Sequence, residues 1–379
     1  MKIVPGGVTT ALGFTAAGIA AGIKRSGKPD LALIACEIPA VSACVITKNS
    51  IKAAPIVVCQ KKMRRQRAQA ILVNSGNANC FTGQFGLLYA QKSTELIGRL
   101  LAIADEDVLV ASTGIIGKPL PYNKIERAAP GLVQKLSRKG GHLAARAILT
   151  TDKWTKEIAV TTTIGGKKIT VGGCAKGSGM IQPNMATMLA FITTDAAINP
   201  KLLDAALRRA VDASFNCITV DGCMSTNDMV SVMASGFAGN HPITAPGKDF
   251  DKFCEALDLV CLDLAKKIVL DAEGGTKFIT VTVKGGRSFA QAKAAAMAVA
   301  NSMLVKCAAF GSDANWGRVA AAVGSLGLNV TEKNLKIDFS SFKKKDIDII
   351  VDLNSGKETA KVYTSDLSFE YVRINGRYN

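Results

Sequence analysis

The part of the sequence with the residues best suited to catalysis is a glycine-rich stretch that ends in a threonine. It runs from Gly172 to Thr187, carries one lysine, Lys176, and leads into the apolar stretch 188–193. A threonine hydroxyl is a useful nucleophile only beside a base, and an N-terminal threonine can use its own α-amine. Because Thr187 is internal, the chain must first break after Ala186. From these residues alone the ordinary strand propensity of threonine is the simpler and favoured explanation, and a self-cleaving threonine enzyme is the alternative.

Other chemistries are poorly supplied. The order of glycines and lysine in this stretch does not fit a phosphate-binding loop. The chain has two histidines, His142 and His241, and each stands next to glycine or proline in a turn-like setting. A Ser-His-Asp or Cys-His mechanism therefore has little to draw on. The ten cysteines include no CxxC pair, so metal-ligand and disulfide-framework spacings are missing.

Several motifs in a fixed order resemble those of the ornithine acetyltransferase (glutamate N-acetyltransferase) family of arginine biosynthesis. The segments 176–181 and 183–189 are similar to the cleavage-site signature of that family, with the cut before Thr187. The resemblance extends over the whole chain through Gly6-Gly7-Val8-Thr9 and the motifs at 74–79, 112–117, 150–152, 225–228, 273–275 and 311–318.

The resemblance implies a role for each matching residue. The threonine matching Thr187 is the nucleophile and carries the acetyl group, and the pair matching Thr113 and Gly114 forms the oxyanion hole. Donors aimed at the oxygen of a tetrahedral intermediate are typically worth about 3–4 kcal/mol each. The family's substrate contacts match Thr150, Lys176, Thr187, Glu273 and Asn375.

Two departures from the family pattern are visible. Relatives often end on a Ser or Thr that helps to bind substrate, and no Ser or Thr follows Asn375 here. The stretch 221–228 has Cys223 where an acidic residue is expected.

The resemblance also implies a reaction and an assembly. N-acetylornithine acylates Thr187 and releases ornithine, and glutamate then takes the acetyl group, without a metal or prosthetic group. Acetyl-CoA as a second donor stays open, and so does an amidase or peptidase in which water attacks the acyl-enzyme. We expect an α chain of residues 1–186 and a β chain of residues 187–379 that stay associated, as two of each. The implied fold is α/β, with layered sheets flanked by helices in an α-β-β-α-like sandwich.

The elements that must position these residues can be outlined. Apolar residues recurring every three or four positions predict a helix over 250–268, and the Asn199-Pro200 pair predicts another beginning there. A third is expected over 87–103. Strands are expected at 158–163 and 169–171 around the Gly165-Gly166 turn, at 277–283 and at 346–351. No linker-like tract marks a domain boundary, so one continuous α/β body is predicted.

Composition limits the partners and the compartment. The net charge of +17 favours acidic partners, but its dense runs at 61–67 and 343–345 lack interleaved aromatics for stacking on bases, so nucleic acid is not expected.

Cys254 and Cys261 are seven residues apart on the helix expected over 250–268, as buried free thiols of a reducing compartment would be. The apolar stretch 8–23 is a weak signal-peptide candidate interrupted by Gly and Thr, and no stretch is long enough to span a bilayer. We expect a cytoplasmic protein without a membrane partner.

Overall fold

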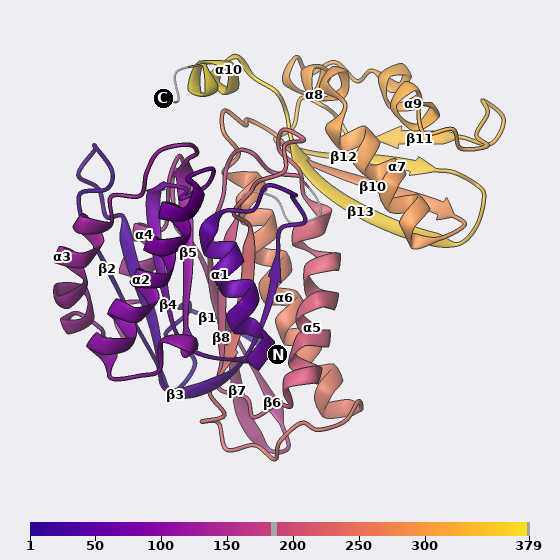
Figure 1. Ribbon diagram of the computed structural model, residues 1–379. Helices are drawn as coiled ribbons and strands as arrows, with labels where there is room; N and C mark the ends of the chain where they lie inside the picture. Colours follow the sequence, from indigo (N-terminus) through magenta and orange to yellow (C-terminus); the bar gives the residue numbers. More distant parts are fainter. Residues whose placement is uncertain (183–187, 377–379) are drawn as a thin grey trace. The chain divides into compact units, whose positions relative to one another are not determined.

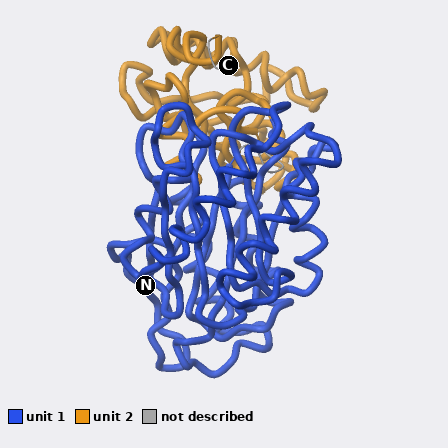
Figure 2. Tube along the Cα trace, turned by 60° about the vertical axis from the view of Figure 1, so that its left-hand side comes forward, with its two compact units in different colours: residues 1–177, 184–215, 224–264 blue, residues 178–183, 216–223, 265–379 orange. Residues whose placement is uncertain are grey.

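The computed structural model describes residues 1–182 and 188–376, and the chain divides into two compact units (Figures 1 and 2). The first unit comprises Met1–Gly177, Asn184–Phe215 and Met224–Leu264. The second comprises Ser178–Pro183, Asn216–Cys223 and Ala265–Asn379. The sequence predicted no boundary, and none of the five crossings between the units is marked by a linker; the last one, after Leu264, lies inside a helix.

The described residues of the first unit form a nine-stranded sheet. Its order is β1-β6-β7-β8-β9-β3-β4-β5, with β2 also paired to β3. The strands are β1 (Lys2–Val4), β2 (Phe14–Ile19), β3 (Leu31–Ile46), β4 (Arg67–Asn77), β5 (Val108–Ile115), β6 (Lys156–Ile164), β7 (Lys167–Lys176), β8 (Leu189–Thr194) and β9 (Met229–Ala234).

One long strand joins the two halves of this sheet. The first half of β3 pairs with β2 and β4, and after a register shift between Ala35 and Ala40 its second half pairs with β9. Two pairings are parallel, β4 with β5 and β8 with β9. Parallel neighbours end at the same edge of a sheet, and ligands commonly bind outside those carboxyl ends.

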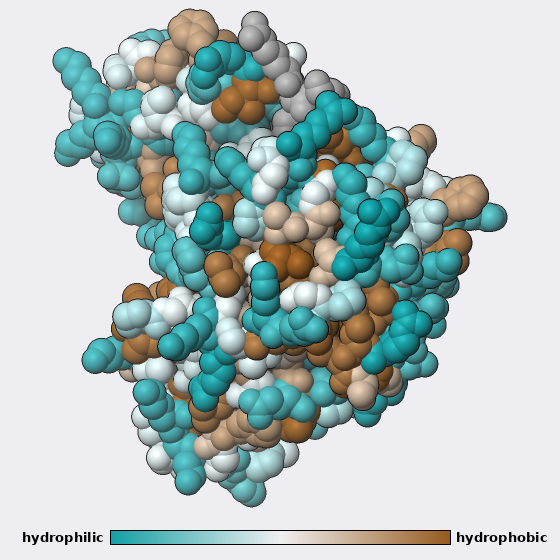
Figure 3. Space-filling view, turned by 90° about the vertical axis from the view of Figure 1, so that its left-hand side faces the viewer, coloured by the Kyte–Doolittle hydropathy of each residue, from teal (hydrophilic) through white to brown (hydrophobic). Residues whose placement is uncertain are grey.

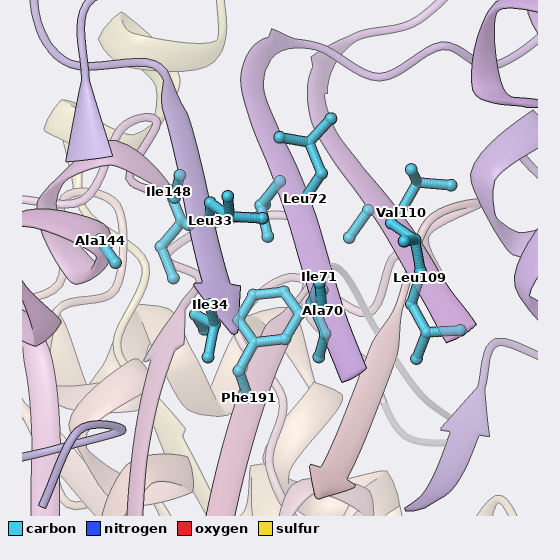
Figure 4. Packing of buried hydrophobic residues seen from close by; sticks show 14 of the residues in the cluster. Leu33, Ile34, Ala70, Ile71, Leu72, Leu109, Val110, Ala144, Ile148 and Phe191 are labelled. Carbon is cyan, nitrogen blue, oxygen red and sulfur yellow. The ribbon is translucent and has the colours of Figure 1, made fainter. Parts of the chain in front are cut away.

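Helices flank the sheet, with α2 and α3 at one side in Figure 1 and α5 and α6 at the other. The six helices are α1 (Ala54–Lys62), α2 (Gly83–Leu101), α3 (Tyr122–Gln134), α4 (Gly141–Ala147), α5 (Pro200–Ala213) and α6 (Lys248–Leu270), which runs past the division at Leu264. Residues of α1 to α4 share one buried cluster with β3, β4 and β5. In Figure 4 Phe191 of β8 lies beside Ile34 and Ile71 in this cluster.

The second unit has its own sheet and core. The strands β10 (Phe278–Gly286), β11 (Lys336–Phe339), β12 (Asp346–Asp352) and β13 (Glu358–Ser365) pair in the order β11-β12-β10-β13. Valine, isoleucine and alanine side chains of this sheet pack against α7 (Phe289–Asn301), α8 (Met303–Phe310) and α9 (Trp316–Gly324). The last helix, α10 (Phe369–Asn375), buries none of its residues fully.

The elements expected from local patterns are confirmed. The helix predicted over 250–268 is α6, with Cys254 and Cys261 both buried. The helix predicted at Asn199 is α5, where the Asn199 side chain caps the Lys201 N–H at 2.9 Å. The helix predicted over 87–103 is α2, and the predicted hairpin is β6–β7. The mixed α/β class with sheets flanked by helices is likewise confirmed.

The surface in Figure 3 alternates hydrophilic and hydrophobic residues, so the face shown there has no continuous apolar band. No single helix in 1–182 or 188–376 is long and apolar enough to cross a membrane. Only α7 and α8 taken together, bent by 56° at the break between them, reach that length and composition.

Candidate active site

The predicted oxyanion pair lies at the carboxyl end of β5, in the first unit. Thr113 is 2% exposed, and Thr113 and Gly114 pair in parallel with Ser75 and Gly76 of β4. Gly114 has φ +134°, and a Cβ added to it would come within 2.4 Å of the Gly76 carbonyl carbon. Only glycine fits such a close approach of two strands. The predicted glycine at this position therefore has a direct structural cause.

Lys176 brings two of the predicted threonines together. It is the last residue of β7, 2% exposed, and its Nζ donates to the hydroxyl oxygen of Thr150 at 2.7 Å and to that of Thr113 at 3.5 Å. These three residues are 26 to 63 positions apart in the chain. Because the lysine is the donor in both contacts, each hydroxyl keeps its own proton to donate, and that of Thr150 donates to the Asp152 carboxylate at 3.5 Å.

A buried carboxylate fixes the charge at this place. Asp152 lies 2.7 Å from the Nζ of Lys156 and 3.8 Å from that of Lys176, and all three side chains are at most 3% exposed. The carboxylate also accepts the N–H groups of Thr150 at 3.0 Å and Gly177 at 2.7 Å. Burial acts to raise the pKa of Asp152, but the two ammonium groups outweigh it and hold that pKa well below its usual range. With both lysines protonated, the cluster carries one net positive charge.

A further lysine, Lys24, lies beside the end of β4, the strand that pairs with β5. A Cβ added to Gly76 would come within 2.9 Å of the Cγ of Lys24, so the stem of this lysine covers the end of β4. Burial lowers the pKa of Lys24 to about 8, with Asp30 opposing the shift and Lys176 adding to it. The field at the end of β4 and β5 therefore favours an anion.

The two remaining predicted contacts lie in the second unit. The Asn375 amide, on α10, donates to Glu273 Oε2 at 2.9 Å and to the Tyr371 carbonyl at 3.1 Å. Glu273 is 6% exposed, and its N–H donates to the Ser178 carbonyl at 2.9 Å. A Cβ on Gly179 would lie 2.2 Å from the Glu273 carboxylate, so this glycine makes room for it.

The structure thus groups the predicted residues by unit. Thr113, Gly114, Thr150 and Lys176 belong to the first unit, and Glu273 and Asn375 form a pair in the second. The predicted cleavage pair, Ala186 and Thr187, lies outside the described residues.

Sequence reasoning missed part of the first unit's cluster. It quoted Asp152 within a motif without a role and gave none to Lys156 or Lys24. The Asp152–Lys156 spacing of four was the one available local signal, because it allows an ion pair.

Neither of two other chemistries gains support. His142 is exposed on α4, and its Nδ1 lies 2.7 Å from the Glu157 carboxylate. His241 is also exposed. Within 1–182 and 188–376 no group of three or more His, Cys, Asp or Glu side chains is placed to hold a metal ion.

Comparison with known proteins identifies the family. A model of the ArgJ family matches residues 15–379. The arginine biosynthesis bifunctional protein ArgJ of Geobacter sulfurreducens is 47% identical over 387 residues, covering 97% of this chain and 98% of the relative. The protein of the same name from Caldanaerobacter subterraneus subsp. tengcongensis is 44% identical over 402 residues, covering all of both chains. A solved chain of ornithine acetyltransferase in complex with ornithine, from Mycobacterium tuberculosis, is 37% identical. It matches 48% of this chain and 97% of its own length, with a TM-score of 0.45.

On a mixed α/β fold, the Thr113 and Thr150 hydroxyls beside the buried Lys176 offer the hydrogen-bond donors and positive charge that an acyl-transfer enzyme uses. The chain belongs to the ArgJ family. The predicted family, and with it the predicted class of enzyme, an acyltransferase of arginine biosynthesis, are confirmed.

Proposed function

We propose that this chain moves an acetyl group from N-acetylornithine to glutamate through an acetyl ester on Thr187. The observation that carries the proposal is Lys176 donating to Thr150 and Thr113 beside Gly114, whose backbone closely approaches Gly76. This arrangement offers hydroxyl and backbone donors with a fixed positive charge, as an acyl-transfer intermediate requires. The names of the curated relatives and of the ornithine-bound structure support the same reaction.

The chain is first cut by its own nucleophile. The Thr187 hydroxyl attacks the Ala186 carbonyl carbon, and the C–N bond to Thr187 breaks as its nitrogen takes a proton. Water then hydrolyses the resulting ester, which leaves a carboxylate on Ala186 and a free α-amine on Thr187. The amine becomes the base that the hydroxyl lacked. The products are an α chain of 1–186 and a β chain of 187–379, in the α-β-β-α-like layering implied by the family.

Transfer follows in two half-reactions. The Thr187 hydroxyl attacks the acetyl carbon of N-acetylornithine, its proton passes to the leaving amine, and ornithine departs. The amine of glutamate then attacks the acetyl ester, and the threonine hydroxyl regains a proton as N-acetylglutamate forms. In both tetrahedral intermediates the negative oxygen faces donors from Thr113 and Gly114.

The remaining residues serve recognition. Donor and acceptor share an amino-acid carboxylate, and a buried ammonium such as Lys176 is a suitable point-charge partner for it. Glu273, held by Asn375, supplies a carboxylate for the ammonium of ornithine. The positive field around Lys24 and Lys176 also suits acetyl-CoA as a second donor, which the word "bifunctional" in the relatives' names supports. We propose a cytoplasmic assembly of two α and two β chains.

Kinetics and mass spectrometry test the proposal. Double-reciprocal plots against N-acetylornithine at several glutamate concentrations should be parallel, because the acetyl group rests on the enzyme between substrates. Mixing with donor alone should place one acetyl group on the peptide that begins at Thr187. Thr187→Ala should lose cleavage and transfer, whereas Thr187→Ser should retain part of both.

Each alternative has its own signature. Intersecting plots without an acetylated peptide mean direct transfer between bound substrates and exclude Thr187 as the carrier. Free acetate in place of N-acetylglutamate identifies an amidase. Replacing N-acetylornithine by acetyl-CoA in the same assay decides whether a second donor is used.

A further inference from the structure

The segment just before β9 contacts both strands that the proposed mechanism uses. Asn227 is 4% exposed, and its amide nitrogen donates to the Ala78 carbonyl at 2.6 Å and to the Ser112 carbonyl at 2.8 Å. Ser112 directly precedes Thr113. One side chain therefore ties the chain that follows β4 to the oxyanion strand β5.

The next residue, Asp228, contacts Met188, which directly precedes β8. Because β8 follows the proposed nucleophile Thr187, it is here called the nucleophile strand. Asp228 is fully buried, and its Oδ1 accepts the Met188 N–H at 2.9 Å. Met188 directly follows Thr187 in the chain, so this contact holds the first described residue after the proposed nucleophile. The other oxygen, Oδ2, has no hydrogen-bond partner among the described residues. Burying a carboxyl group costs free energy, and the hydrogen bond from Met188 is one of the interactions that offset this cost.

The segment 225–228 is also hydrogen-bonded to Thr47, the residue that follows β3. The Thr47 N–H donates to the Asp228 carbonyl at 3.1 Å, and the Thr47 hydroxyl donates to the Ser225 carbonyl at 2.7 Å. The Ser225 hydroxyl accepts the Asn227 N–H at 3.0 Å. Residues 225–228 are thus held by Thr47, which follows β3, as well as by their contacts to Ala78, Ser112 and Met188.

We propose that Asn227 and Asp228 are positioning residues that hold the oxyanion strand and the nucleophile strand in register for cleavage and transfer. The inference deepens the proposed function and rests on it. Acyl transfer requires donors and nucleophile placed to a few tenths of an ångström, and a displacement of about 1 Å can cost about 10²-fold in rate. A neutral Asp228 suffices, since the contact needs only its carbonyl-type oxygen. Burial raises the pKa of Asp228 well above its usual range, against the Met188 N–H, Ser225 and Lys176, which lower it.

Three variants and one matched control test this role. Asp228→Ala removes the acceptor, Asp228→Asn keeps an oxygen in its place, and Asn227→Ala removes the contacts to Ala78 and Ser112. Ser231→Ala is the control, because Ser231 is equally buried on β9 and its hydroxyl has no hydrogen-bond partner among the described residues. Cleavage is followed on denaturing gels over time, kcat and KM for N-acetylornithine are measured on the cleaved protein, and folding is checked by the melting temperature.

A positioning role predicts a specific pattern of changes in cleavage rate, kcat and KM among these variants. Asp228→Ala and Asn227→Ala should slow cleavage and lower kcat by about 10²-fold with KM within about threefold of wild type. Asp228→Asn should stay within about tenfold, and Ser231→Ala should equal wild type. If Asp228→Ala does not fold, Asn227→Ala and Asp228→Asn carry the test.

Other outcomes overturn the inference. Wild-type rates in both alanine variants mean that neither contact positions anything. A loss in Asp228→Asn as large as in Asp228→Ala means that the accepting oxygen is not what matters. If kcat falls and KM rises by similar factors, and both changes follow the fall in melting temperature, the role of these residues is purely structural. If wild type and Ser231→Ala neither cleave nor transfer, the proposed function fails instead, which separates the two failures.

Discussion

Asp152 is the residue on which the charge of the first unit's site depends. Its carboxylate lies 2.7 Å from the ammonium of Lys156 and 3.8 Å from that of Lys176, and removing one partner of a buried ion pair typically costs about 3–5 kcal/mol. With the carboxylate in place, the Lys176 ammonium lies beside two hydroxyls, and the Thr113 hydroxyl keeps its proton to donate. The cluster therefore combines a stable buried ion group with the capacity to stabilise a developing oxyanion.

The hydroxyl of Thr113 can be tested separately from the backbone of Gly114. In Thr113→Ala we expect kcat to fall by about 10²–10³-fold, because one donor to the oxyanion is lost. Thr113→Ser keeps the hydroxyl and should retain most of the activity. Steady-state kinetics on correctly folded, cleaved protein give the answer. A normal kcat in the alanine variant would remove Thr113 from the oxyanion hole.

Sequence could identify individual residues only where a motif contained them. Thr113, Gly114, Thr150 and Lys176 each stand in a recognisable motif, and the structure brings the side chains of Thr113 and Thr150 to Lys176. The role of Asn227 could not be predicted, because its partner Ser112 is 115 positions away in the chain. Such a contact depends on the order of strands, which no local pattern contains.

Lys306 predicts a pH dependence of stability in the second unit. It is 4% exposed in α8, and it donates to the Thr364 hydroxyl at 2.7 Å and to the Ser365 carbonyl. Burial lowers its pKa from 10.5 to about 8, although Asp366 and Asp221 oppose the shift. Between pH 8 and 10.5 the unfolded chain therefore binds the extra proton, so this residue's contribution to stability rises with pH.

The comparison with Lys306→Met isolates the effect. From pH 7 to pH 9 the free energy of unfolding of wild type should rise by about 1 kcal/mol relative to the variant. Denaturant titrations at three pH values measure it. Lys284→Met, on β10 in the same unit, is the control, since Lys284 is exposed to water. A difference that does not change with pH, or that falls, contradicts the prediction.

Elements fixed by short-range patterns were predictable, and those fixed by distant pairing were not. The β6–β7 hairpin follows from two glycines with φ +55° and +75°, which its two-residue turn requires. The helix α6 follows from its apolar period. The parallel pairing of β4 with β5, which brings Gly114 close to Gly76, joins segments separated by a helix, and the sequence contains no signal for their register.

Gly274 controls how α10 is held, and with it the position of Asn375. Its φ is +67°, and an added Cβ would lie 2.3 Å from the backbone nitrogen of Tyr371. The Ser368 hydroxyl donates to the Gly274 carbonyl at 2.6 Å at the start of the same helix. Gly274→Ala must displace α10 and so weaken the hydrogen bond from Asn375 to Glu273. We expect KM for N-acetylornithine to rise by about tenfold, which corresponds to about 1.4 kcal/mol of binding.

Gly327→Ala is the matched control for this substitution. Gly327 has nearly the same φ, +65°, in the same unit, and an added Cβ would meet nothing within 4 Å. It therefore reproduces the backbone strain, which costs of order 1–3 kcal/mol, without the steric conflict. Both variants should lose stability through backbone strain, Gly274→Ala more because of the added conflict with Tyr371, and only Gly274→Ala should change KM. Equal KM values would separate α10 from substrate binding.

At the scale of the whole molecule, the division into compact units differs from the division that cleavage would produce. The first unit contains residues from both predicted chains, since β1 to β7 precede the cleavage site and β8 and β9 follow it. Packing and processing therefore partition this protein in two different ways.

The sheet order predicts that the cleaved chains stay together. β8 and β9, from the predicted β chain, lie between β7 and β3, from the predicted α chain. β8 pairs with β7 from Leu189 to Thr194, and β9 pairs with β3 from Met229 to Ala234. Separating the chains would break two strand pairings in the interior of the sheet and expose the core cluster that contains Phe191 and Met233. Cleaved wild type and uncleaved Thr187→Ala should therefore elute alike from a sizing column. The two wild-type chains should part only in denaturant, at the midpoint where the sheet itself unfolds. Chains that separate in native buffer would contradict the interleaved order of these strands.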